Sequence, residues 1–148
     1  MSDKTVEVEL HQVQDYRFRI EFGTTVPALI GDEPPPLGLA SGPSPVQLLT
    51  ASVGNCLSDS LLFALRKFKQ HPEPLRTRMS AQVGRNPDGR LRVLSMVADL
   101  HLGVPASALE HLQRVLDSFE QYCTVTQTVA AAVPIELRVF DSEGQRVK

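Results

Sequence analysis

Alternating apolar and polar residues predict the first two structural elements. Residues 6–10 carry valine, valine and leucine at every second position, and residues 16–22 carry tyrosine, phenylalanine, isoleucine and phenylalanine in the same way. A period of two is typical of β-strands, and the polar connection at residues 12–15 is short enough for an antiparallel hairpin. We expect the aromatic face of this hairpin to be buried against a partner surface, with Arg17 and Arg19 on the other face.

The pattern changes after the hairpin. Residues 31–45 are rich in proline and glycine, which predicts an ordered loop without regular structure. Ser44 then stands as an N-cap, Pro45 occupies the first helical position, and Gln47 completes a capping box. A helix is therefore expected to begin here.

Apolar residues cover most of the circumference of this helix from Pro45 to about Lys69, which predicts a core helix. About 25 residues at ~1.5 Å each give a length of roughly 37 Å, more than a 148-residue monomer comfortably encloses. We therefore expect a second subunit to help cover it. The small residues Ala51, Ser52 and Gly54 would let the central helices of the two subunits approach closely.

Further periodic segments follow towards the end of the chain. Residues 76–83 and 91–102 flank the turn signal Asn86-Pro87-Asp88-Gly89, which predicts a second hairpin. Pro105 then opens a segment whose apolar residues recur at three and four positions as far as Cys123, typical of a helix with Cys123 pointing inward. Residues 135–140 alternate as a final strand, and the polar residues 141–148 are expected to fray.

Composition and charge narrow the function classes. A chain of 148 residues with 42% hydrophobic content predicts one domain over residues 1–148. The net charge of −2 and the absence of a basic run argue against a nucleic-acid or anionic membrane partner. Asp59 and Arg66 interrupt the longest apolar stretch, so no membrane span is expected, and the start of the chain does not resemble a secretory signal. We expect a cytoplasmic protein.

Metal and cofactor motifs do not emerge from the pattern. The four histidines show no paired ligand spacing, and two distant cysteines do not make a zinc motif. No phosphate-binding loop or Ser-His-acid arrangement is recognisable. We therefore expect neither a metal nor a cofactor.

The two cysteines are the best lead to chemistry. Cys56 and Cys123 both lie in apolar segments rather than in exposed loops. In a reducing compartment such a pair is either inert core filling or redox chemistry, because a free thiol behaves as a small hydrophobe until its thiolate is stabilised. The absence of a Cys-x-x-Cys motif disfavours a general disulfide oxidoreductase.

Three motifs in this order are similar to those of a known family. They are Gly42-Pro43-Ser44-Pro45 before the long helix, Gly54-Asn55-Cys56 within it, and Cys123-Thr124-Val125 late in the chain. The sequence resembles the OsmC/Ohr family of thiol-dependent hydroperoxide reductases over nearly its whole length. The resemblance implies an α+β fold in which antiparallel sheets wrap around long central helices in an intertwined homodimer.

The resemblance also implies a chemistry. Cys56 would attack an organic hydroperoxide or hydrogen peroxide as a thiolate and become a sulfenic acid, Cys123 would capture it as a disulfide, and an external dithiol would reduce that disulfide. A thiol with the unperturbed pKa of ~8.5 is only a few per cent thiolate at pH 7, so a cation is needed beside Cys56. The helix dipole does not suffice, because Cys56 lies about three turns inside the helix.

The sequence departs from the family where that cation is held. Relatives use an arginine oriented by a glutamate at the start of the cysteine helix, but Val46 and Gln47 stand there. Arg17 and Arg19 are the candidate thiolate-stabilising residues, although both also fit a solvated strand face. Two acids of the preceding loop, Asp32 and Glu33, could replace the missing carboxylate, although they also fit an ordinary surface position.

A second interpretation therefore stays open. The protein could be a non-enzymatic binding or redox-sensing relative with a degenerate site. Its motivation is that Val46 and Gln47 stand where the family glutamate would be. An unpaired Asp59 carboxylate beside Cys56 would also raise the thiol pKa and oppose activation, whereas pairing of Asp59 with Arg66 or exposure to solvent would not.

Overall fold

The computed structural model describes residues 2–148, which form two compact units. The first unit ends at Leu48 and the second runs from Leu49 to Lys148. That the whole chain acts as one domain stays a prediction. The chain contains both helices and strands, so its fold is mixed α+β.

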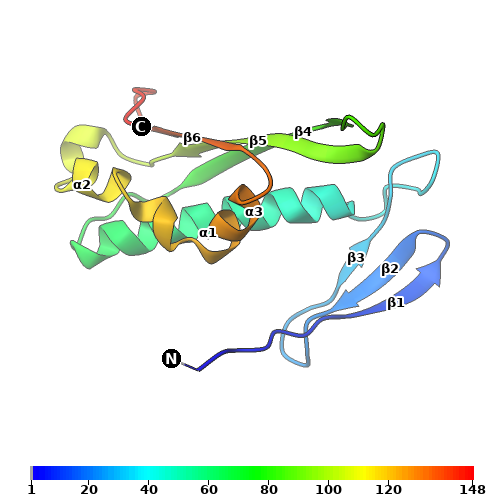
Figure 1. Cartoon of the computed structure of the whole chain (residues 1–148). Coiled ribbons are helices and arrows are strands. Elements are labelled where there is room, and N and C mark those ends of the chain that lie inside the picture. Colours follow the sequence, from blue (N-terminus) through cyan, green and yellow to red (C-terminus); the bar gives the residue numbers. More distant parts are fainter. Residues whose placement is uncertain (1) are drawn as a thin grey trace. The chain divides into compact units, whose positions relative to one another are not determined.

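The first unit is a small antiparallel sheet. Its strands are β1 (Glu9–Gln14), β2 (Arg17–Glu21) and β3 (Leu29–Gly31), in the order β1-β2-β3 (Figure 1). The predicted hairpin of the first two strands is confirmed, with Asp15 in the turn at a φ of 50°. Strand β3 was not predicted, because three residues are too few to show an alternation.

The apolar face of this sheet is not covered within the first unit, so its burial against a partner surface stays a prediction. Ile20 is buried, but Leu10 is 56% exposed and Tyr16 is 50% exposed. Phe18 and Phe22 are also exposed. Three strands alone have too little material to cover one of their own faces.

The long helix α1 (Pro45–Lys67) begins as the sequence predicts. The backbone N–H of Ser44 donates to Gln47 Oε1 at 2.9 Å, and the backbone N–H of Gln47 donates to Ser44 Oγ at 3.2 Å. This reciprocal pair is a capping box, which satisfies two N–H groups that the helix itself leaves free. Helix α1 is also long and apolar enough to cross a membrane by length and composition, as core helices can be.

Only one stripe of α1 is buried in the second unit, rather than most of its circumference. The buried residues recur at three and four positions, which places them on one face. They are Val53, Gly54, Leu57, Leu61 and Leu65. Phe63, on another face, is 67% exposed.

The second unit has a three-stranded sheet of its own. Strands β4 (Arg76–Arg85) and β5 (Leu91–His101) form the predicted antiparallel hairpin, and β6 (Ile135–Phe140) follows in the order β4-β5-β6. Strand β6 runs parallel to β5, so the expectation of purely antiparallel sheets is wrong here. A parallel neighbour requires a long crossover, and residues 102–134 supply it.

The crossover is broken into short pieces, so the single helix predicted from Pro105 to Cys123 is wrong. Its turns are η1 (Ala106–Ala108), α2 (Leu112–Leu116), η2 (Phe119–Tyr122) and α3 (Thr124–Ala130). His111 has a φ of 60°, which a continuous right-handed helix does not allow. The apolar spacing nevertheless places these pieces correctly, because they still face the core.

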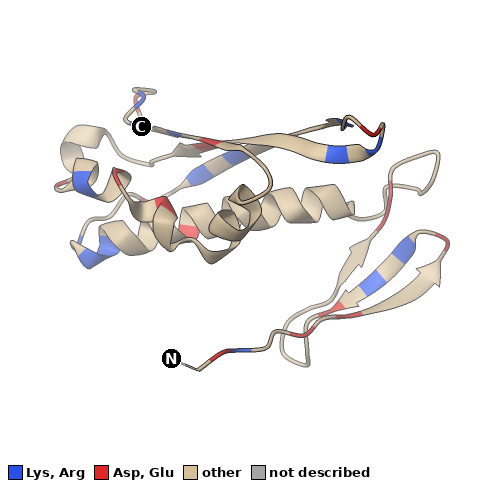
Figure 2. Ribbon diagram, in the orientation of Figure 1, with Lys and Arg blue, Asp and Glu red and all other residues tan. Residues whose placement is uncertain are grey.

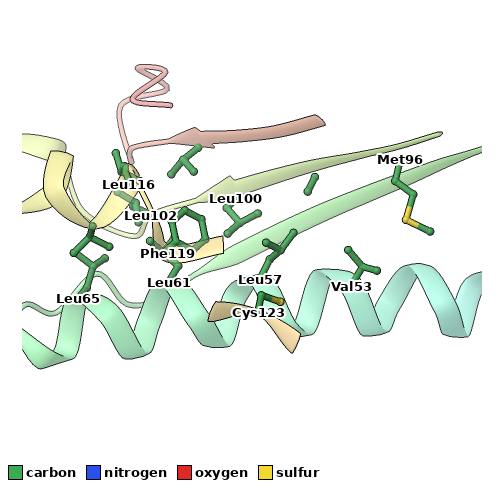
Figure 3. Packing of buried hydrophobic residues seen from close by; sticks show 13 residues of the cluster. Val53, Leu57, Leu61, Leu65, Met96, Leu100, Leu102, Leu116, Phe119 and Cys123 are labelled. Carbon is green, nitrogen blue, oxygen red and sulfur yellow. The ribbon is translucent and has the colours of Figure 1, made fainter. Parts of the chain in front are cut away.

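The core of the second unit lies between α1, the sheet and the crossover. Figure 3 shows Leu57 and Leu61 of α1 facing Leu100 of β5 and Phe119 of η2. A methyl group on Gly54 would lie 2.6 Å from Met79 Cγ of β4. Gly54 therefore allows α1 to approach the sheet, not another helix as the sequence suggested.

Residues 141–148 do not fray, contrary to expectation. The buried Asp141 carboxylate accepts backbone N–H groups from Ala106, Glu143 and Gln145, and these bonds lower its pKa. The backbone N–H of Val147 donates to the carbonyl of Val139 at 2.8 Å, so the tail folds back along β6. Polarity alone suggested a loose tail, but these polar groups are used internally.

Candidate active site

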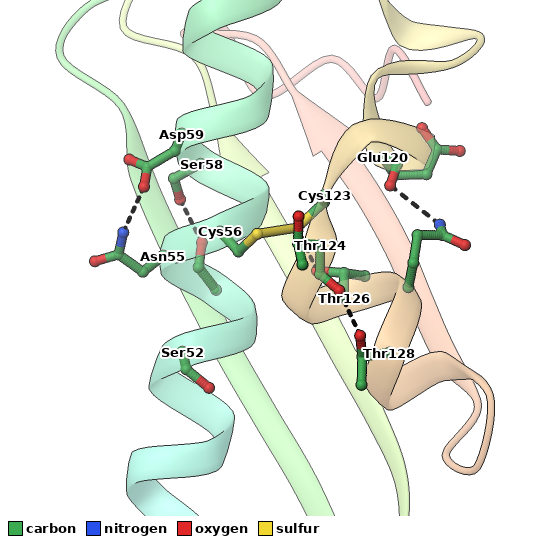
Figure 4. The surroundings of a disulfide bond; sticks show 12 residues. Ser52, Asn55, Cys56, Ser58, Asp59, Glu120, Cys123, Thr124, Thr126 and Thr128 are labelled. Atoms are coloured by element: carbon green, nitrogen blue, oxygen red, sulfur yellow. Dashed lines mark hydrogen bonds between the residues drawn. A yellow bond between two sulfur atoms is a disulfide. The ribbon is translucent and has the colours of Figure 1, made fainter. Parts of the chain in front are cut away.

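Cys56 and Cys123 form a disulfide in the second unit (Figure 4). Their Cα atoms lie 5.9 Å apart across a separation of 67 residues. Cys56 comes from the middle of α1, and Cys123 stands at the junction between η2 and α3. The resemblance implied this pairing, and the structure brings the two residues together.

The two sulfur-bearing residues differ in exposure. Cys123 is 1% exposed, whereas Cys56 is half-buried. The Cys123 backbone is held on both sides, because its N–H donates to Glu120 O at 3.1 Å and its carbonyl accepts from Gln127 N at 2.9 Å. Cys123 is therefore fixed in the core, and Cys56 is the more accessible of the two.

Thr126 places a hydroxyl group against the disulfide. Its side chain is buried, and its Oγ1 lies 2.8 Å from Cys123 Sγ. Because a disulfide sulfur carries no hydrogen, the Thr126 hydroxyl is the donor. Sequence reasoning missed this residue, although a threonine three positions after a buried cysteine was a usable signal.

Asp59 does not lie unpaired at the thiol. Its carboxylate accepts a hydrogen bond from Asn55 Nδ2 at 2.8 Å, and this pair extends from α1 in a different direction from Cys56 (Figure 4). Arg66 pairs with Glu73 instead of Asp59. Asp59 is nevertheless the sole charged residue of α1 before Arg66 (Figure 2), so the helix itself brings no cation close to Cys56 in sequence.

In the first unit, Arg17 lies beside a buried carboxylate. Asp32 is 3% exposed, and its Oδ2 lies 4.0 Å from Arg17 Nε. Hydrogen bonds from Ser41, together with those from the backbone of Glu33 and Leu39, lower the pKa of Asp32 to about 2. These bonds also order the loop after β3, as predicted. Asp32 is thus an ionised carboxylate beside Arg17 at neutral pH.

Arg19 has different surroundings. Its Nε lies 3.0 Å from Glu21 Oε1, and its side chain is 56% exposed. Arg17 is 27% exposed, and its Nε is buried with no hydrogen-bond partner. Of the two arginines, Arg17 is therefore the less exposed one, and its Nε–H is still able to donate a hydrogen bond.

A cavity of about 740 Å³ lies in the second unit between α1 and the α2–η2 segment. Its walls include Asp59 and Ser60, which follow Cys56 by three and four residues, and Tyr122, which precedes Cys123. Phe63 and Phe119 make part of the wall apolar. Neither cysteine lines the cavity, but its wall includes residues close to both of them in sequence, and the cavity can hold an apolar group.

A group of possible metal ligands lies elsewhere, on the first sheet. Ligand atoms of Glu9, His11 and Glu21 lie within 4.8 Å of one another, all at least partly exposed. Glu21 already pairs with Arg19. The sequence did not indicate this group, because its members come together only through the pairing of β1 with β2.

Comparisons with known proteins agree with this geometry. The structure superposes on an OsmC-like protein of unknown function from Vibrio cholerae with a TM-score of 0.79 at 13% identity, covering 93% of this chain and 100% of that one. An organic hydroperoxide resistance protein from Elizabethkingia anophelis gives 0.72 at 15% identity, covering 95% and 99%. One from Legionella pneumophila gives 0.71 at 15% identity, covering 94% and 98%. A search of curated proteins found no match.

At these identities the superpositions establish the fold. The family assignment comes from the sequence, because the family model described as OsmC-like protein matches residues 38–138, which is more than half of the chain. The matched range contains both cysteines of the disulfide. The chain belongs to the OsmC-like protein family.

Proposed function

We propose that the protein is a thiol-dependent peroxidase that reduces organic hydroperoxides or hydrogen peroxide. The observation that carries the proposal is the Cys56–Cys123 disulfide, which joins a half-buried cysteine on the long helix to a fixed, buried one. The Cys56 thiolate attacks one peroxide oxygen, the O–O bond breaks, an alcohol (or water, from hydrogen peroxide) is released, and the Cys56 sulfur becomes a sulfenic acid. Cys123 then displaces water from that sulfur and forms the disulfide, which an external dithiol reduces.

The cavity favours an organic hydroperoxide as substrate. Part of its wall is apolar, so an alkyl or aryl group can be accommodated there. Hydrogen peroxide has no group to place in such a cavity. Relatives in solved structures that are described as organic hydroperoxide resistance proteins support the same substrate class.

Activation of Cys56 needs a cation, and we propose Arg17 for this role. The carboxylate of Asp32 beside it takes the orienting part that a glutamate at the helix start would play. Gln47 is already engaged in the capping box, so it is not available for that part. Arg19 is the weaker candidate because Glu21 pairs with it at the surface.

We further propose a homodimer in the cytoplasm. The exposed apolar face of the first sheet supports a second copy as the covering surface. The length of α1 supports a second copy as well, because a helix of this length is longer than a 148-residue monomer comfortably encloses. Sedimentation equilibrium should give twice the monomer mass of 16.3 kDa, and a monomer at micromolar concentration would contradict the dimer.

A turnover assay tests the enzymatic function. Wild-type protein should consume many equivalents of cumene hydroperoxide with a dithiol reductant. Cys56→Ser should consume none, and Cys123→Ser should accumulate a sulfenic acid that dimedone traps. Full turnover by Cys56→Ser would overturn the proposal.

One observation favours a second candidate, a non-enzymatic binding or redox-sensing protein. Neither Val46 nor Gln47 is a carboxylate, and the charged residue that α1 carries near Cys56 in sequence is the acid Asp59. Such a protein would oxidise once, or not at all, without catalytic turnover. The same assay separates the two candidates by the number of equivalents consumed.

A further inference from the structure

The Thr126 hydroxyl has an unusual hydrogen-bond acceptor. A threonine in a helix commonly donates to the carbonyl four residues earlier, as Thr128 does to Thr124 O at 2.8 Å. Thr126, in the same helix, instead donates to Cys123 Sγ at 2.8 Å (Figure 4). Both atoms belong to buried residues, so the hydroxyl has its donor aimed at the sulfur in a place where water is excluded.

The disulfide is therefore asymmetric towards a reductant. A thiolate attacks one sulfur and expels the other as a thiolate, so the reaction prefers an accessible sulfur to attack and a stabilised sulfur to expel. Cys56 is the half-buried partner, and Cys123 is the buried partner with a hydrogen-bond donor. Both preferences therefore favour attack at Cys56 and release of Cys123.

We propose that the reducing dithiol attacks Cys56, and that Thr126 is the donor that stabilises the Cys123 thiolate as it leaves. The proposal rests on the function proposed above, in which this disulfide is reduced in every cycle. Attack at Cys123 would require the reductant to enter the core and would expel Cys56 without this hydrogen bond.

The electrons balance with the dithiol as the only reductant. One of its sulfurs forms a bond to Cys56 Sγ while the Cys56–Cys123 bond breaks, and the electron pair remains on Cys123. The second sulfur of the dithiol then attacks the mixed disulfide, closes the dithiol into its own disulfide and releases Cys56. The protein gains two electrons and the dithiol loses two, and its two protons end on the two thiols or in solvent according to pH.

The site of attack can be mapped without peroxide. Protein oxidised with diamide is mixed with glutathione, a monothiol, and the freed cysteine is captured within seconds by N-ethylmaleimide. Peptide mass spectrometry should find glutathione on Cys56 and maleimide on Cys123. The reverse distribution, or equal amounts on both, would overturn the proposal. Because no peroxide is used, failure of the peroxidase function leaves this result readable.

Substitutions at Thr126 test the hydrogen bond. Thr126→Val keeps the shape but removes the donor, so reduction of its disulfide by dithiothreitol should be about tenfold slower, and the share of glutathione on Cys56 should fall. Thr126→Ser keeps the donor and should reduce at close to the wild-type rate. An unchanged rate and an unchanged adduct distribution in Thr126→Val would contradict the proposal.

Thr128→Val is the matched control, since it removes a hydroxyl from the same helix that does not contact the disulfide. It should leave both readouts at wild-type values. If Thr128→Val slows reduction as much as Thr126→Val, the effect comes from the packing of α3 and the proposal fails. Thermal unfolding of the oxidised variants checks that all of them are folded.

Discussion

The Nζ atom of Lys148 lies 2.7 Å from Oε1 and 2.9 Å from Oε2 of Glu120, three residues before Cys123. The same ammonium group donates to the carbonyl of Leu116 and lies 5.3 Å from the centre of the Phe119 ring. Residues at the end of the chain thus hold the turn that presents Cys123. The site therefore includes a fixing contact from outside the cysteine motifs.

Removal of this contact should loosen Cys123 more than it unfolds the protein. Lys148→Met is expected to cost about 0.5–1 kcal/mol in the free energy of unfolding, because the pair is partly screened by solvent. Disulfide formation after peroxide addition should slow severalfold, since Cys123 would be less well positioned. Urea unfolding and stopped-flow thiol loss measure the two effects, with the exposed Lys4→Met as control. Equal rates in both variants would show that the contact has no positioning role.

Asp32 should make stability depend on pH in a defined window. Its pKa is lowered from 3.8 to about 2 in the folded protein, so the folded state binds the proton less readily than the unfolded chain does. Its stabilising contribution is therefore fully present above about pH 5 and is lost as pH falls through 3.8 towards 2. Asp32→Asn should be less stable than wild type at pH 7, and the gap should narrow in that acidic range.

Urea unfolding from pH 7 down to pH 2.5 checks this expectation. Asp88→Asn removes one carboxylate from an exposed turn and is the matched control. A gap between Asp32→Asn and wild type that stays constant over this pH range would mean that the carboxylate's charge does not hold the loop.

Arg17 and Arg19 should differ in their effect on Cys56. If Arg17 supplies the activating cation, Arg17→Met should raise the pKa of the Cys56 thiol and slow its oxidation by at least about tenfold, since each pKa unit corresponds to ~1.4 kcal/mol. Arg19→Met is the matched control on the same strand and should leave both values near those of wild type. The pH dependence of Cys56 alkylation in a Cys123→Ser background gives the pKa. The reverse ranking would move the role to Arg19.

A substitution in the cavity wall should weaken the binding of an organic hydroperoxide and leave the reaction with hydrogen peroxide unchanged. Phe63→Ser removes an exposed aromatic ring from its wall, so KM for cumene hydroperoxide should rise about tenfold while kcat/KM for hydrogen peroxide stays unchanged. Leu91→Ser, an equally exposed apolar residue on the hairpin, is the control. A parallel loss for both peroxides in Phe63→Ser would indicate a general effect on Cys56 and not a substrate contact.

Several features of this account could be predicted from the sequence because they depend on local patterns. The capping box at Ser44 and Gln47, the second hairpin and the final strand follow from short-range spacing, and all are confirmed. The inward position of Cys123 also follows from spacing, although the helix expected around it is broken. Apolar periodicity reports which side faces the core, but a backbone break such as that at His111 leaves the periodicity nearly intact.

Other features depend on contacts between residues far apart in the chain. The Lys148–Glu120 pair, the approach of Gly54 to Met79 and the parallel pairing of β6 become visible only when the chain is folded. The cysteines could be found from the sequence, and their pairing followed from the family resemblance. The placement of Arg17 beside a buried carboxylate could not be predicted, because it depends on the burial of Asp32 by loop residues that no periodicity describes.

The most direct test of the account is the stoichiometry of a single oxidation. Fully reduced protein is mixed with one equivalent of cumene hydroperoxide without reductant, and free thiols are counted and mapped by peptide mass spectrometry. One peroxide should remove two thiols per chain within seconds and leave a Cys56–Cys123 disulfide. Two thiols still free, or a Cys56 sulfinic acid beside an untouched Cys123, would contradict it.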